Sequence, residues 1–101
     1  MVKMIKVEIK KDLIKITGHA NFADAGKDIV CASVSSIVYT TVNGILNIDK
    51  DAIKFSDKKD VLEIKILNKN KVTTILINNM VDLLNELEVQ YPKNIKIDKG
   101  E

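Results

Sequence analysis

The sequence is poor in several residue types that mark particular protein classes. It has one cysteine, one proline, no tryptophan and no arginine, because all 16 basic residues are lysines. One cysteine cannot form an internal disulfide, so we expect a free thiol in a reducing compartment, the cytoplasm. Aromatic residues make up only 4% of the chain. The core must therefore be built from isoleucine, valine and leucine.

The lack of arginine and of long apolar runs argues against two kinds of partner. Sequence-reading nucleic-acid modules rely on arginine for paired contacts with bases and phosphates, and this chain has neither a basic run nor an aromatic stacking platform. Its net charge is only +2, with lysines and acids scattered throughout. No apolar run approaches the roughly 20 residues of a membrane span, and the N-terminal residues alternate charged with apolar, unlike a signal peptide. We expect neither direct nucleic-acid binding nor a membrane partner.

The 101 residues, 46% of them hydrophobic, are enough for one compact domain and too few for two. We therefore treat residues 1–101 as a single domain. Alternation of apolar and polar residues predicts strands, the last at an edge, over 4–10, 13–17, 52–55, 61–67 and 94–98. Polar stretches at 11–12 and 56–60 predict the turns of two antiparallel hairpins.

Two helices are predicted at 29–48 and 71–90 from apolar residues at three- and four-residue spacing. Asp28 is the expected N-cap of the first helix, and Pro92 follows the end of the second. The main apolar stripe of the second helix consists of Val72, Leu76, Met80, Leu83, Leu84 and Leu87. Off this stripe the same helix carries Ile75, Ile77, Val81 and Val89. This is more apolar surface than one buried face requires, and a homodimer would bury the surplus.

The order β-β-α-β-β-α-β describes an α+β fold. We expect a mainly antiparallel sheet with the two helices covering it.

The chain's only histidine and only cysteine lie in the stretch GHANFADAGKDIVCAS, at His19 and Cys31. With Asp28 as N-cap, Cys31 falls in the first helical turn, where unpaired N–H groups and the helix dipole stabilise a thiolate. The carboxylate of Asp28 opposes this effect unless N–H groups or the histidine neutralise it. The connecting loop is long enough to fold back, so the imidazole could take the thiol proton and later protonate a leaving amine. The same helix start could supply an oxyanion hole, and Ser35 lies one turn further along the same face.

Structural roles explain the same residues. A cysteine near a helix start is often a small buried hydrophobe, and a lone loop histidine is often solvated. Ser35 could bond back to the carbonyl of Cys31, and Asp28 could be no more than a cap. One histidine, one cysteine and scattered acids fall short of a three- or four-ligand metal site. We expect no metal and no other cofactor.

These residues resemble those of a known family, the bacterial ribosomal-processing cysteine proteases called Prp. The resemblance extends over the whole chain, and its motifs are GHA at 18–20, GKDIVCA at 26–32, Ser35 and VNGI at 42–45. It implies that Cys31 is the nucleophile and His19 the base of a small endopeptidase that acts as a homodimer. It also implies that Gly18, Gly26 and Asp28 shape a mobile loop that orders over the bound peptide, and that Ser35 supports the site from within the helix.

The resemblance further implies the substrate. These proteases remove a short N-terminal extension, rich in leucine and phenylalanine, from the precursor of the large-subunit ribosomal protein number twenty-seven. Such a segment needs an apolar groove, whose expected lining around the loop is Phe22, Ala23, Ala25 and Ile29. A third residue that orients His19 is not evident, and Asp24 and Asp28 are the candidates.

Two other classes of function stay open at this point. One is a non-catalytic ribosome-associated module whose surface lysines contact rRNA. The other is a redox or thiol-transfer protein, which the absence of a second, resolving cysteine disfavours.

Overall fold

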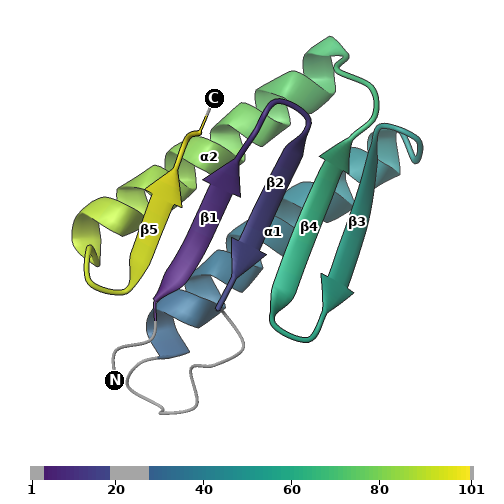
Figure 1. Cartoon of the computed structure of the whole chain (residues 1–101). Helices are drawn as coiled ribbons and strands as arrows, with labels where there is room; N and C mark the ends of the chain where they lie inside the picture. The colour runs from purple at the N-terminus through teal and green to yellow at the C-terminus, as the bar shows by residue number, and fades with distance from the viewer. Residues whose placement is uncertain (1–3, 19–27, 101) are drawn as a thin grey trace.

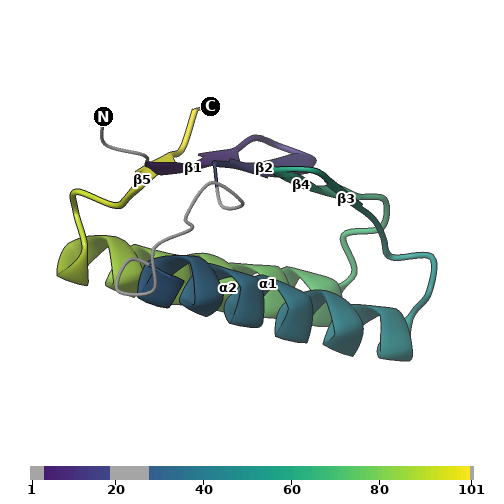
Figure 2. The same cartoon turned by 90° about the horizontal axis from the view of Figure 1, so that it is seen from below.

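The computed structural model describes residues 4–18 and 28–100, which form one sheet with two helices packed on one of its faces (Figure 1, Figure 2). The elements are β1 (Ile5–Ile9), β2 (Leu13–Thr17), α1 (Asp28–Ile48), β3 (Ile53–Lys58), β4 (Val61–Ile66), α2 (Lys71–Gln90) and β5 (Ile95–Asp98). The predicted α+β class and the order β-β-α-β-β-α-β are confirmed.

The five strands lie in the order β3-β4-β2-β1-β5. The hairpins β1–β2 and β3–β4 join through an antiparallel pairing of β2 with β4, whereas β5 runs parallel to β1. A parallel partner requires a long connection, and α2 supplies it by carrying the chain from β4 to the opposite edge. The sheet is therefore mainly antiparallel, as expected, with its last strand at an edge.

The second hairpin differs from the prediction, because β3 continues through most of the stretch expected to turn. Its last residues pair with β4 up to Lys58, opposite Val61, and leave only Lys59 and Asp60 as the turn. Lys59 has φ 53°, the left-handed conformation that two-residue hairpin loops use. The polar residues of 56–58 concealed the strand because an edge strand needs backbone pairing more than buried side chains.

The core lies between the sheet and the helices, so each strand has one buried face and alternating residues face solvent. In the central strands the fully buried residues are Ile5, Val7, Ile14, Ile16, Leu62 and Ile64. The buried residues of α1 are Val30, Val34, Val38, Val42 and Ile45. All of α1's buried residues follow the three- and four-residue spacing from which the helix was predicted.

Only half of the residues predicted to form the buried stripe of α2 are buried. Met80, Leu84 and Leu87 are buried, but Val72 and Leu83 are 44% and 38% exposed. Their places are taken by Thr73 and Ile77, which are 2% and 7% exposed. The assignment of Ile77 to a second face was therefore wrong, since it faces the core.

By length and composition alone, α1 could cross a membrane. Its residues Ile29–Ile48 have a mean hydropathy of 1.6, and 28% of that stretch is buried. Serine, threonine and asparagine interrupt the apolar runs of this helix, so no continuous apolar stretch marks it in the sequence. In this fold α1 packs one face under the sheet, as the core helix of a globular protein does, so its composition is weak evidence for a membrane span.

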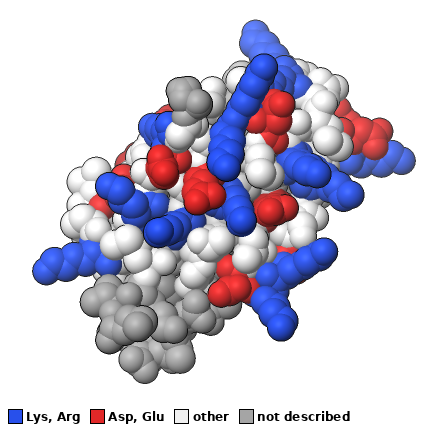
Figure 3. Space-filling view, viewed as in Figure 1, with Lys and Arg blue, Asp and Glu red and all other residues white. Residues whose placement is uncertain are grey.

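The other face of the sheet carries charged side chains. Glu8 lies opposite Lys15, which in turn lies opposite Glu63, so charges of opposite sign alternate across three strands. Figure 3 shows lysines and acids interspersed over this face. The mixture offers no continuous basic surface on this side, in keeping with the expectation of no direct nucleic-acid binding, which stays a prediction.

Candidate active site

Cys31 lies in the first turn of α1 and is half-buried. The helix begins at Asp28, one residue earlier than predicted. Asp28 is thus the first helical residue and not the cap, and Cys31 is the fourth residue of the helix. Its side chain packs against the core cluster while part of it stays accessible. The thiol is therefore neither a fully buried hydrophobe nor a surface group, and it lies near the positive end of the helix dipole.

Gly18 directs the chain as it leaves β2. It has φ +89°, and its N–H donates to the carbonyl of Asp60 at 3.2 Å. A Cβ at this position would lie 2.6 Å from the carbonyl oxygen of Met4, so only glycine fits. Met4 was not among the predicted site residues. Its approach to Gly18 results from the strand pairing, which leaves no signal in the sequence.

The end of β2 and the start of α1 lie at the same end of the sheet (Figure 1). The segment that joins them, 19–27, contains most of the predicted site. The residues of the prediction that lie outside the described part of the chain are His19, Phe22, Ala23, Asp24, Ala25 and Gly26. The side chain of Asp28 is likewise outside it. Whether His19 reaches Cys31, and which carboxylate orients it, therefore stay predictions.

Two further predicted residues flank Cys31 on α1. Ser35 is half-buried one turn further on. Further along the same helix, the hydroxyl of Thr41 donates to the carbonyl of Ile37 at 2.8 Å, the kind of back-bond considered for Ser35. Both the local role and the supporting role considered for Ser35 stay predictions. Ile29, two residues before Cys31, is 56% exposed.

A groove lies between α1 and α2, and the first of its lining residues in the sequence is Ala32, directly after Cys31. This interhelix groove has a volume of about 440 Å³. It is lined by Ala32, Ser33, Ser36, Ile37, Leu83, Glu86, Leu87 and Gln90. Its lining is almost uncharged, with Glu86 as the single ionisable side chain.

Within 4–18 and 28–100, no three side chains of histidine, cysteine, aspartate or glutamate gather where they could hold a metal ion. The expectation that the site works without a metal stays a prediction, because most of the candidate site lies outside these ranges.

Comparisons with known proteins give a consistent result. A family model described as "Cysteine protease Prp" matches residues 4–96. The chain is 31% identical over 98 residues to the ribosomal processing cysteine protease Prp of Mycoplasma genitalium, covering 95% of this chain and 96% of that protein.

Two solved structures of the ribosomal processing protease Prp from S. aureus share the fold, each at 20% identity and covering 99% of this chain and 100% of theirs. One is in complex with a substrate peptide and superposes with a TM-score of 0.83. The other holds a covalently linked product peptide and superposes with a TM-score of 0.81.

Proposed function

The chain belongs to the Prp family of ribosomal processing cysteine proteases, and from this premise we propose that it removes the N-terminal extension of the large-subunit ribosomal protein number twenty-seven. The relatives are named for ribosomal processing, which supports a ribosomal-protein precursor as the substrate. The reaction takes place in the cytoplasm, where a single cysteine remains a free thiol.

Cys31 and His19 perform the chemistry in this proposal. His19 takes the proton of the Cys31 thiol, and the thiolate attacks the carbonyl carbon of the scissile peptide bond. The resulting oxyanion is stabilised by N–H groups at the start of α1. His19 then gives the proton to the leaving amine, and a thioester links the extension to Cys31 until water hydrolyses it.

The position of Cys31 is the observation that carries the proposal. A reactive cysteine needs partial exposure and a nearby positive potential, and the first turn of α1 provides both. Ile29, exposed in the same helical turn, is an apolar side chain that a leucine- and phenylalanine-rich peptide could contact. The covalently linked product peptide of the S. aureus protein is the kind of species that nucleophilic catalysis by a cysteine produces.

Incubation with the precursor ribosomal protein of the same organism tests the function. We expect one cut near the precursor's N-terminus under reducing conditions, located by mass spectrometry of both fragments. The mature ribosomal protein, which lacks the extension, is the matched control and should stay intact. A precursor that remains whole, or one cut at many sites, would contradict the proposal and leave a non-catalytic ribosome-associated role as the better explanation.

The protein acts as a homodimer in this proposal, with the interhelix groove of each protomer facing the other. Residues 29–48 of α1 contain no charged side chain. On α2, Ile75 is 55% exposed, and Leu83, which lines the groove, is 38% exposed. A surface with exposed apolar side chains and a single charge, that of Glu86, gains free energy when a partner covers it, and a second copy of the chain carries the same surface for a two-fold interface.

Leu83→Glu should weaken this dimer at least about tenfold, because it places a carboxylate in the apolar interface. Analytical ultracentrifugation would measure the shift from twice the chain mass of 11.3 kDa to the single chain. Val89→Glu is the matched control, since Val89 is 80% exposed on the same helix but, although it belongs to the apolar surplus of that helix, does not line the groove. A dimer that survives Leu83→Glu unchanged would place the interface elsewhere.

A further inference from the structure

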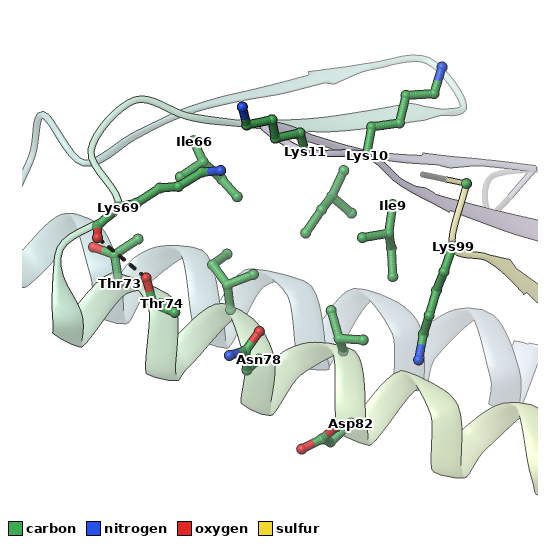
Figure 4. A pocket seen from close by; sticks show the side chains of 14 residues that line it. Ile9, Lys10, Lys11, Ile66, Lys69, Thr73, Thr74, Asn78, Asp82 and Lys99 are labelled. Carbon is green, nitrogen blue, oxygen red and sulfur yellow. Dashed lines mark hydrogen bonds between the residues drawn. The ribbon is translucent and has the colours of Figure 1, made fainter.

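A second cavity lies at the opposite end of the sheet from Cys31, between the β1–β2 turn and the first half of α2. This cleft has a volume of about 840 Å³, within the range of small-molecule sites. Its floor is aliphatic and consists of Ile9, Ile14, Ile66, Ile77 and Val81. Figure 4 shows the sheet above the cleft and α2 below it.

The rim of the cleft is positively charged. Its lining includes four lysines and a single acid, Asp82. In Figure 4, Lys99 runs from the end of β5 across the opening toward α2, while Lys69 reaches under the sheet from the other end. Lys69 is held by Asp12 at 2.7 Å, and this hydrogen bond keeps the pKa of Asp12 below its usual range. Lys99 has no such ion pair among the described residues and extends across the opening, so its ammonium can meet an incoming anion.

We propose that this cleft binds a single-chain anionic amphiphile of the fatty-acid type. Its hydrocarbon chain lies on the aliphatic floor along α2, and its carboxylate meets Lys99. The lining residues of α2 extend from Thr73 to Asp82, a rise of roughly 13 Å and comparable to an extended chain of about ten carbons. Burial of the chain supplies most of the free energy, and the lysine selects for a negative end.

The cleft is independent of the candidate active site. In the β1–β2 hairpin, Ile9 pairs with Ile14 at the cleft end, whereas Lys6 pairs with Thr17 at the end that leads into Gly18. The two sites thus lie at opposite ends of the same strands, and binding at the cleft does not depend on the protease function.

Decanoate is the probe, titrated into the whole chain by isothermal titration calorimetry, and decanol is its uncharged analogue. We expect saturable binding of decanoate with a Kd between about 10 µM and 1 mM, weaker binding of decanol, and a loss of affinity at high salt. Lys99→Glu should weaken decanoate binding about fivefold, the effect of an exposed charge pair. Val81→Glu should weaken it at least about tenfold, because it places a charge on the aliphatic floor.

Lys96→Glu is the matched control, since Lys96 is exposed on β5 but does not line the cleft. It should leave decanoate affinity unchanged. The proposal is wrong if decanoate shows no saturable binding, or if Lys99→Glu and Lys96→Glu have equal effects. It is also wrong if the wild type does not bind decanoate and Val81→Glu disrupts the dimer. The cleft would then be part of an interface between two copies of the chain.

Discussion

Replacing Cys31 by alanine is expected to lower kcat/KM for cleavage of the precursor at least about 10³-fold, to the detection limit of the assay. Alanine removes the nucleophile, and no other cysteine in the chain can take its place. Because Cys31 is only half-buried at the end of the core, the variant should still fold. Its circular dichroism spectrum and melting temperature should stay close to those of the wild type.

Two controls separate chemistry from structure in this experiment. Thr40→Ala removes a side chain that is exposed on the same helix and should keep kcat/KM within about twofold of the wild type. Mass spectrometry of the wild type during turnover should show a transient adduct on Cys31 with the mass of the removed extension. Full activity in Cys31→Ala would exclude the thioester mechanism, whatever the substrate.

His19→Ala should reduce kcat by about 10² to 10⁴-fold, the range of general base catalysis. Imidazole added to the buffer should restore part of this loss, because a small base can enter the space that the side chain leaves. Asp24→Ala is the matched variant, and it tests whether the Asp24 carboxylate orients His19. If His19→Ala keeps kcat within about twofold of the wild type, then His19 is not the proton acceptor.

The predictability of the two helices differed, and the reason lies in their composition. In α1 the residues between the apolar positions are mostly serine, threonine and asparagine, so only one stripe can face the core. In α2, apolar side chains occur nearly all round the helix, and both 72-76-80-83-87 and 73-77-80-84-87 satisfy helical spacing. The choice of the second stripe, with Thr73 in place of Val72, is made by packing against the sheet and α1. A single sequence does not contain that information.

Only those features of the site that depend on residues close together in the sequence could be predicted. The first-turn position of Cys31 follows from helical periodicity, and the structure moves it by one residue. The need for glycine at position 18 was implied by family resemblance, whereas its physical cause, the carbonyl of Met4, is a contact between residues 14 positions apart. The interhelix groove and the cleft beside Lys99 also depend on such distant contacts, so neither was predicted.

Gly18→Ala should lower the free energy of unfolding by at least about 2 kcal/mol, because it combines a strained left-handed backbone with a steric clash. The new Cβ would lie 2.6 Å from the carbonyl oxygen of Met4, and backbone at a strand end cannot move aside as a flexible side chain can. For a chain of this size the melting temperature should fall by about 10 °C. Since His19 follows directly, we also expect lower kcat/KM at temperatures where the variant is fully folded.

Gly44→Ala is the matched substitution with the opposite expected sign. Gly44 lies inside α1, and a Cβ there meets no atom within 4 Å. Alanine restricts the unfolded chain and favours the helix, so the free energy of unfolding should rise by about 0.5 to 1 kcal/mol. Thermal and urea unfolding of both variants against the wild type would measure the pair. If Gly18→Ala proved as harmless as Gly44→Ala, then β2 would not fix the chain direction at Gly18, and position 18 would not serve to place His19 beside Cys31.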